Sequence, residues 1–250
     1  MSLHEYARNI IENTALDADE TSMSIIHPEV FVRNRSINLF VGKPGCSKTT
    51  SICQELIKIS ALNIPENHLI IWVNNTSSDR TVNNYKKYIN IPLINLDYET
   101  FTNAYPKFLK FKDDYNKMIS GQIPKDDSIL DALYIKQFTT NPLQTIIVLD
   151  DAVNILKDTE SCLAKSLYRT RHSNCLFFIA IQIWKGITAQ LKSIINSVWI
   201  FSGFSPQILH HIYNQITTDE SFDEFKNKYN MIDKYEKLIV DNISGKSIII

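Results

Sequence analysis

The segment 37–62 constrains the fold more than any other part of the chain. It begins with the apolar run INLFV, continues through the loop GKPGCSKTT, and ends in apolar residues at helical spacing. A buried strand that leads through small residues into a helix is the setting in which backbone N–H groups and the helix dipole bind phosphate. The sequence therefore predicts a strand, a phosphate-binding loop and a helix in succession.

Each position of this loop has an expected role in binding a nucleotide. Gly42 and Gly45 allow the backbone to wrap around phosphate, and they are two of only six glycines in the chain. Lys48 is expected to bridge the terminal phosphates, and the Thr49 hydroxyl is expected to reach Mg²⁺. The predicted nucleotide-binding residues are Gly42, Lys43, Pro44, Gly45, Cys46, Ser47, Lys48, Thr49 and Thr50.

Ser47 departs from the motif G-x-x-x-x-G-K-[ST], in which its position usually holds glycine. A serine fits there if its backbone dihedral angles are near helical, and GKPGCSKT resembles loops of some AAA+ ATPases. A second possible motif, SGKS at 244–247, has Val240 at the first glycine position. That segment is predicted to be a hairpin turn.

Two adjacent acids follow another buried run. TIIVL at 145–149 leads directly into Asp150 and Asp151. A carboxylate at the end of a buried strand is aimed rigidly at bound phosphates, so Asp150 is expected to hold Mg²⁺ through its water shell. Asp151 is expected to orient and polarise the attacking water, which favours a hydrolase. Asp97, with Glu99 beyond it, is a competing acidic site, although polar and proline residues interrupt the run before it.

Gln182 follows the apolar run 175–181 and is expected to touch the γ-phosphate or the attacking water. The alternative is an amide that caps backbone groups at the strand end. Ring ATPases commonly complete one active site with an arginine from the neighbouring subunit, because a guanidinium stabilises charge on the transferred phosphoryl group. Arg171 is the first candidate and Arg169 the second, and surface ion pairs near a helix end are the alternative for both.

Short apolar runs alternate with segments of helical spacing along the chain, which is typical of an α/β domain with a mainly parallel sheet. One helix is predicted after Lys48, ending by Pro65, and another is predicted to begin at Pro106 and to end before Gly121. Residues 1–27 are predicted to form an N-terminal arm or helix, and 28–250 a P-loop ATPase domain. The predicted strands are 37–41, 69–73, 93–96, 145–149, 175–181, 198–201 and 238–240.

The charge balance limits how the chain can contact nucleic acid. Its 250 residues include 26 Lys and Arg and 27 Asp and Glu, for a net charge of −1, so no basic surface covers the whole domain. Any such contact must be local, and solvated helix faces are the commoner explanation for the basic clusters. Those clusters are Lys107, Lys110, Lys112 and Lys117 in one segment, and Arg80, Lys86 and Lys87 in another.

The loop at 42–49, the run VLDD at 148–151, Arg171 with His172, and FIAIQ at 178–182 together resemble the genome-packaging ATPases of large DNA viruses and virophages. These belong to the poxvirus-type branch of the FtsK–HerA superfamily, whose ATPase domains are RecA-like P-loop NTPases of the ASCE class. The resemblance extends from about residue 28 to 250. It implies a homo-oligomeric ring that uses ATP and Mg²⁺ to drive double-stranded DNA, without sequence preference, into a preformed capsid through a capsid or portal-vertex protein.

Other functions remain open from the residues alone. An AAA+-like ATPase that remodels proteins would use the same loop, although no arginine follows Arg171. A nucleotide-binding scaffold with little turnover and a small-molecule kinase are further alternatives. The chain shows neither a secretory signal nor an apolar run long enough to span a membrane, so we expect a protein of the host cytoplasm, at the viral factory, or of the virion.

Overall fold

A computed structural model of the chain describes residues 25–27, 32–33, 35–61, 68–75, 80–154, 156 and 160–250. For residues 25–27, 33 and 171 it describes the backbone alone. Most of the predicted N-terminal arm, residues 1–24, and the predicted helix end at Pro65 lie outside these ranges. The two short strands β1 (Ile25–His27) and β2 (Val32–Arg33) pair antiparallel beside the main sheet.

The core of the protein is an eight-stranded sheet with the strand order β10-β9-β8-β3-β7-β6-β4-β5. The six strands from β8 to β5 are parallel, and β9 and β10 add an antiparallel hairpin at one edge. The strands are β3 (Ile37–Val41), β4 (His68–Asn74), β5 (Leu93–Asp97), β6 (Gln144–Leu149), β7 (Cys175–Ile181), β8 (Ser197–Phe201), β9 (Lys237–Asp241) and β10 (Ser247–Ile249). The prediction of a mainly parallel sheet is confirmed, and each of its seven strands is present.

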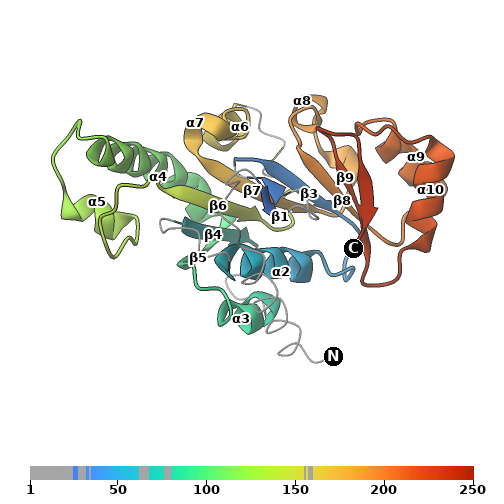
Figure 1. Ribbon diagram of the computed structural model, residues 1–250, viewed down its shortest axis with the longest axis horizontal. Coiled ribbons are helices and arrows are strands. Elements are labelled where there is room, and N and C mark those ends of the chain that lie inside the picture. The colour runs from blue at the N-terminus through green and yellow to red at the C-terminus, as the bar shows by residue number, and fades with distance from the viewer. Residues whose placement is uncertain are drawn as a thin grey trace.

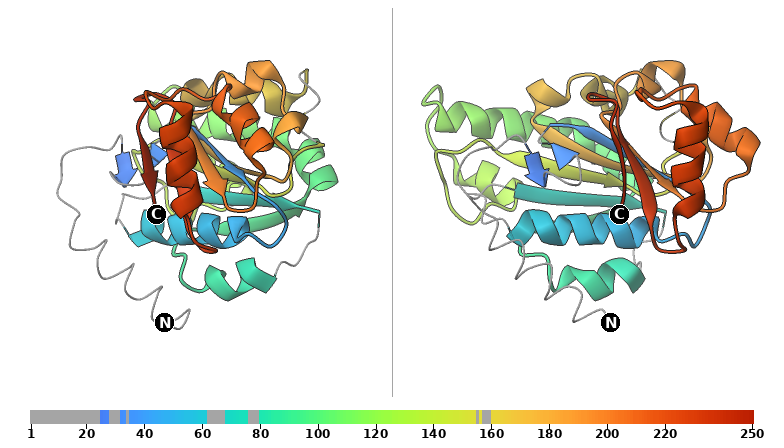
Figure 2. Two further views of the ribbon diagram at one scale, coloured as in Figure 1. Left: turned by 90° about the vertical axis from the view of Figure 1, so that its right-hand side faces the viewer. Right: turned by 45° about the vertical axis from the view of Figure 1, so that its right-hand side comes forward.

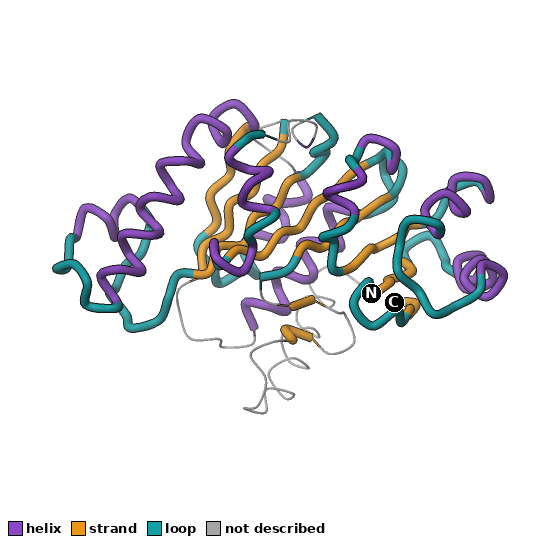
Figure 3. The backbone as a smooth tube through the Cα atoms, turned by 90° about the horizontal axis from the view of Figure 1, so that it is seen from above, coloured by secondary structure: helices purple, strands orange, loops and turns teal. Residues whose placement is uncertain are grey.

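Helices cover both faces of this sheet (Figure 1). One face packs against α2 (Lys48–Ala61) and α3 (Arg80–Lys86), which run beneath the sheet in Figure 2. Seen from above, the strands lie side by side between the helical layers (Figure 3). The other face packs against α4 (Tyr98–Ile119), α5 (Asp127–Ala132), α6 (Cys162–Leu167), α8 (Ala189–Lys192), α9 (Pro206–Tyr213) and α10 (Phe222–Met231), with the short α7 (Thr170–Ser173) and the 3₁₀ turn η2 (Trp184–Gly186) between them.

Burial on both faces explains why the central strands are continuous apolar runs. In β4, Ile70 and Trp72 pack with α2, whereas Leu69, Ile71 and Val73 belong to the cluster on the opposite face. Successive side chains of a strand point to opposite faces, so even-numbered residues of β4 and of β6 lie on the α2 face. The same alternation decides which polar residues at the strand ends can face the loop that precedes α2.

The predicted start of the fourth helix at Pro106 is wrong. α4 begins at Tyr98, and Asp97 is its N-cap, because its carboxylate accepts a hydrogen bond of 2.7 Å from the Thr100 backbone N–H. Pro106 lies inside the helix with its ring exposed to solvent. The predicted end is confirmed, since the helix stops at Ile119 and Gly121 follows with a φ of +73°. The side-chain cap formed by Asp97 therefore determines where the helix starts, and the helix accommodates Pro106 in its interior.

No helix in the described ranges is both long enough and apolar enough to cross a membrane.

Candidate nucleotide-binding site

The predicted site residues gather at the carboxyl edge of the parallel strands. The loop 42–47 follows β3, Asp150 and Asp151 follow β6, and Gln182 follows β7, which lies between β3 and β6. Open parallel sheets bind ligands at this edge, outside the carboxyl ends of their strands. The fold therefore brings three segments that are far apart in the sequence to one place.

Two glycines shape the loop for different reasons. A Cβ atom on Gly42 would lie 2.4 Å from Cys46 Sγ and 2.8 Å from Phe201 Cβ, so the close approach of the backbone requires glycine. Gly45 has open space around it but a φ of +76°, which glycine adopts without steric cost. The loop therefore folds back tightly before α2 begins at Lys48. The first N–H groups of a helix have no intrahelical partner, which leaves those at the start of α2 suited to bind phosphate.

Ser47 does not have the near-helical dihedral angles under which a serine would fit this position easily. Its φ is +72°, in the left-handed region, and its carbonyl oxygen accepts a 2.9 Å hydrogen bond from the Ser51 N–H in the first turn of α2. The position therefore has a backbone conformation that favours glycine. A serine in this conformation carries strain that a glycine would not.

We expect Ser47→Gly to raise the free energy of unfolding by up to about 1 kcal/mol, because relief of left-handed strain exceeds the extra entropy of glycine in the unfolded chain. Ser47→Val should lower it by more than about 1 kcal/mol, since a β-branched side chain fits this region poorly. Urea unfolding curves measure both changes. A glycine variant less stable than the wild type would contradict the claim that the backbone of Ser47 is strained.

Lys48 is held over the loop by uncharged partners. Its Nζ donates to Gly42 O at 2.7 Å and to Lys43 O at 3.0 Å, and it lies 3.8 Å from Cys46 Sγ. Burial raises the pKa of the Cys46 thiol, which therefore stays protonated beside the ammonium group. Only 8% of Lys48 is exposed to solvent. A cation that is buried against carbonyl oxygens is ready to exchange some of them for phosphate oxygens.

The two predicted metal ligands meet in the structure. Thr49 Oγ1 donates to Asp150 Oδ2 at 3.0 Å, across 101 positions of sequence. A hydroxyl and a carboxylate at this separation fit Mg²⁺, which binds proteins through one or two oxygen ligands and keeps phosphate oxygens and water in its other positions. The described ranges hold no group of three or more His, Cys, Asp or Glu side chains suited to a metal ion. Thr49 and Asp150 could therefore supply two oxygen ligands to Mg²⁺, with nucleotide phosphates and water as the others.

Asp151 and Gln182 are also neighbours. Gln182 Nε2 donates to Asp151 Oδ1 at 3.0 Å, and Asp151 has a φ of +59°. β6 ends at Leu149, and Asp151 lies in a left-handed turn beyond it, where it is exposed. The carboxylate and the amide together can hold a water molecule, since each oxygen of the acid accepts hydrogen bonds and the amide both donates and accepts.

Sequence reasoning missed two residues at this edge. Tyr98 donates its hydroxyl hydrogen bond to the carbonyl oxygen of Asp150, and burial together with the charges of Asp150 and Asp151 raises the pKa of Tyr98 well above its usual range. Asn74 ends β4 on the α2 face, next to Val73, whose carbonyl oxygen accepts from the Asp150 N–H. It is 5% exposed, and neither of its amide atoms has a hydrogen-bond partner within the described ranges.

The missed residues differ in the sequence signal that they leave. Asn74 shows the same signal as Gln182, a polar side chain directly after a buried run, and could have been found by it. Tyr98 leaves none, because its place depends on where α4 begins and on the order of the strands.

The structure does not bring the two candidate arginines to this edge. Arg169 and Arg171 lie beside and within α7, which precedes β7, whereas Gln182 follows the same strand. They therefore lie at the amino edge of the sheet, and the loop 42–47 lies at the carboxyl edge. The side chain of Arg171 lies outside what the structure describes.

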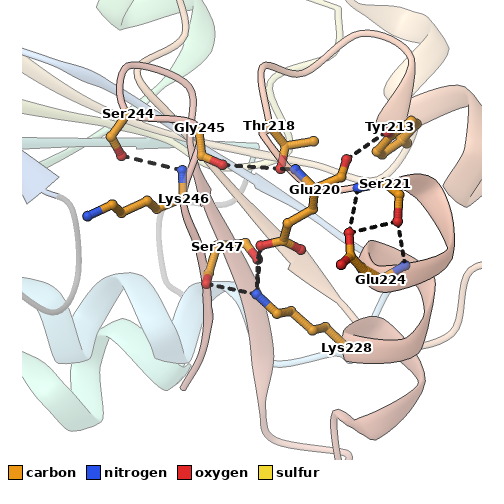
Figure 4. A network of polar contacts seen from close by, with 10 residues as sticks. All are labelled: Tyr213, Thr218, Glu220, Ser221, Glu224, Lys228, Ser244, Gly245, Lys246 and Ser247. Atoms are coloured by element: carbon orange, nitrogen blue, oxygen red, sulfur yellow. Dashed lines mark hydrogen bonds and ion pairs between the residues drawn. The ribbon is translucent and has the colours of Figure 1, made fainter.

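Neither competing feature in the sequence is part of the site. Asp97 serves as the N-cap of α4, and its pKa is lowered because the carboxylate accepts hydrogen bonds from Thr100. The segment 244–247 belongs to the predicted hairpin: residues 244–246 lie in the turn between β9 and β10, and Ser247 begins β10. Figure 4 shows it packed against the start of α10, where Gly245 O accepts from Thr218 Oγ1 and Ser247 bonds to Glu220. The Gly245 carbonyl group and the Ser247 hydroxyl group are therefore already bonded within the fold.

No protein-family model matches the sequence, and no curated protein matches it significantly. Solved structures do match. The genome packaging NTPase B204 from Sulfolobus turreted icosahedral virus 2, in complex with ATP-gammaS, superposes with a TM-score of 0.59 at 15% identity, covering 86% of this chain and 96% of its own. B204, the DNA-packaging ATPase from Sulfolobus Turreted Icosahedral Virus, gives 0.56 at 14% identity, covering 86% and 97%.

A third match broadens the comparison. EssC (ATPases 2 and 3) from Geobacillus thermodenitrificans gives a TM-score of 0.56 at 14% identity, and the match covers 86% of this chain and 39% of that one. The resemblance inferred from the motifs is therefore confirmed at the level of the fold: the chain has the P-loop ATPase fold of the viral genome-packaging NTPase B204.

Proposed function

We propose that this protein is an Mg²⁺-dependent ATPase that moves double-stranded DNA into a preformed viral capsid. The observation that carries the proposal is the meeting of Thr49 with Asp150 and of Gln182 with Asp151 at one edge of the sheet. The chain has the fold of the genome packaging NTPase B204, whose structure is known in complex with ATP-gammaS. The motifs quoted from the sequence are those of the same class of protein.

The loop 42–50 would bind the phosphates of ATP. Backbone N–H groups of the loop and of the first turn of α2 donate to phosphate oxygens, and Lys48 replaces its bonds to Gly42 O and Lys43 O with bonds to the terminal phosphates. Thr49 and Asp150 would hold Mg²⁺, directly or through water. When bound, the ion neutralises charge on the phosphates.

Asp151 and Gln182 would position the attacking water. The carboxylate accepts a hydrogen bond from the water and polarises it, and the amide fixes the carboxylate through the 3.0 Å bond to Oδ1. Gln182 can also reach the γ-phosphate, because it follows β7, the neighbour of β3. Tyr98 supports this arrangement by bonding to the carbonyl oxygen of Asp150.

The protein would act as a homo-oligomeric ring, with Arg171, or Arg169 in its place, completing the site of the neighbouring subunit. Both belong to the edge opposite their own loop, so only a second subunit could use them at a nucleotide. Residues 28–250 would form the ATPase domain and 1–27 an arm. The ring would meet a capsid or portal-vertex protein in the host cytoplasm or in the virion.

Mixing inactive subunits tests the role of Arg171 between subunits. Arg171→Ala and Asp151→Asn are each expected to stop ATP hydrolysis alone. In mixed rings, some interfaces combine an intact Asp151 with an intact Arg171, so a measurable part of the wild-type rate should return. Folded variants whose mixtures stay inactive would contradict a role of Arg171 across the interface.

The experiment that tests the proposed function is the stimulation of ATP hydrolysis by double-stranded DNA. We expect duplexes of any sequence to raise the rate, and the stimulation to fall as salt rises, because phosphate contacts release counterions. Hydrolysis without any response to DNA would instead favour a protein-remodelling ATPase. Nucleotide binding without hydrolysis would favour a scaffold.

A further inference from the structure

A pocket of about 430 Å³ opens at the amino edge of the sheet, on the side covered by α6, α7 and α8. Arg35, before β3, lies on one side of it, and Arg169 and His172 come from the α7 region. Lys192, the last residue of α8, and Asn196, before β8, also line it. Segments that are distant in the sequence thus form one recess.

The charged side chains that line this pocket are all basic. Arg35, Arg169, His172 and Lys192 line it, and no Asp or Glu is among its described lining residues. The whole chain has a net charge of −1, so this is a local concentration of positive charge. Thr170 and Thr217 belong to the same lining. Arg, Lys, Ser and Thr side chains are the usual donors to phosphate oxygens in complexes with DNA.

Two of the cations are held in place by the fold. Arg35 Nε donates to Asn174 Oδ1 at 2.7 Å, which uses one of its five N–H donors and orients the rest. Lys192 Nζ donates to Gln215 Oε1 at 2.7 Å and lies 5.2 Å from the centre of the Trp184 ring. Burial lowers the pKa of Lys192, so its charge is incompletely hydrated and an anion beside it would be stabilised.

The position of the pocket excludes the protein's own nucleotide. Arg35 precedes β3 and the loop 42–47 follows it, and the five residues of this strand span about 16 Å. A nucleotide in a neighbouring subunit is enclosed by that subunit's own loop, so only a protruding side chain can reach it. The basic residues of this pocket lie in a recess instead. A recess can receive an anionic group that projects from the surface of its own molecule, as the phosphates of a DNA duplex do.

We propose that this pocket binds a backbone phosphate of double-stranded DNA. The inference rests on the proposed function and names the surface by which the ATPase would hold its DNA. The pocket is a different surface from the lysine clusters considered from the sequence. Lys112 is 2% exposed and bonds to Thr145 and Asn174, so it is not available as a phosphate contact. Lys117 pairs with Asp113 at 2.6 Å on the exposed surface of α4.

The test is the affinity of the full-length protein for a fluorescent 30-base-pair duplex, measured over a range of salt concentrations for Arg35→Gln, Lys192→Gln and the double variant. Each single variant should bind about 3 to 10 times more weakly at 0.1 M salt, and the slope of log K against log salt should flatten by about 0.9 for each contact removed. ATP hydrolysis without DNA should match the wild type.

Lys107→Gln with Lys110→Gln is the matched control, because it removes the same charge from the exposed surface of α4. Pocket variants that bind DNA as the wild type does, or controls that lose as much affinity, would overturn the inference. So would a fall in hydrolysis without DNA, which would mark a contact with a neighbour's nucleotide. If Arg35→Gln unfolds because it loses the bond to Asn174, the DNA affinity of Lys192→Gln alone tests the inference. A wild type that binds no duplex would refute the proposed function itself.

Discussion

Asp151→Asn is expected to bind ATP as tightly as the wild type and to hydrolyse it 10² to 10⁴ times more slowly, the range in which loss of a positioned base lowers a rate. The substitution keeps the local geometry. Asparagine tolerates the left-handed region, so a φ of +59° remains accessible, and its amide oxygen can still accept from Gln182 Nε2. What is lost is the negative charge that polarises the water.

Single-turnover hydrolysis and equilibrium binding of a fluorescent ATP analogue separate these two effects. Asp97→Asn is the matched control, since it removes the same charge at the end of β5, and asparagine is as good an N-cap as aspartate. That variant should hydrolyse ATP at the wild-type rate. An Asp151→Asn enzyme as fast as the wild type would refute the role of Asp151.

Lys48→Ala is expected to weaken ATP binding by at least about tenfold, and by up to several hundredfold, because each hydrogen bond to a charged group contributes about 1.5–3 kcal/mol. The fold should remain intact. Alanine is the best helix former and Lys48 is the first residue of α2, so the helix is unaffected. Hydrolysis should fall below detection at ATP concentrations that saturate the wild type.

Isothermal titration with ATP and Mg²⁺ measures the loss, and thermal melting confirms that the variant is folded. Lys86→Ala, at the exposed end of α3 on the same side of the sheet, removes an equal charge and should bind ATP normally. Wild-type affinity in Lys48→Ala would show that the loop 42–50 does not bind the phosphates.

The parts of this fold that the sequence predicted are those decided by local pattern. Cys175 to Ile181 is buried on both faces, so the strand reads as an uninterrupted apolar run, and its predicted limits match those of β7. Gly42, Lys48 and Thr49 could be assigned roles for the same reason. The order of residues from β3 into α2 defines their positions relative to one another.

What could not be predicted depends on long-range packing or on backbone detail. The start of α4 was misplaced because Pro106 is a strong local signal, and only the observed bond between Asp97 and Thr100 reveals the true N-cap. The left-handed conformation of Ser47 could not be predicted, because serine rarely adopts it and nothing in the sequence signals it. Tyr98 reaches Asp150 because α4 starts directly after β5 and because only β4 lies between β5 and β6 in the sheet.

The pocket at the amino edge was hidden for a related reason. Arg35, Arg169 and Lys192 are separated by more than twenty positions from one another, and no run of basic residues marks them. Strands β3, β7 and β8 lie side by side, so the segments that precede them meet at one edge. A near-neutral chain can therefore still present a local basic surface.

The most direct test of ATP-driven movement along DNA is the displacement of a third strand from a linear duplex. A labelled oligonucleotide bound as a triplex at one end is released when a translocase reaches it, and the release is followed by gel or fluorescence. We predict release by the wild type with ATP and Mg²⁺, later for triplexes placed farther from the loading site, and none with Asp151→Asn or Lys48→Ala. A wild type that hydrolyses ATP and binds the duplex, yet leaves the triplex in place at every distance, would contradict the claim that this protein moves DNA.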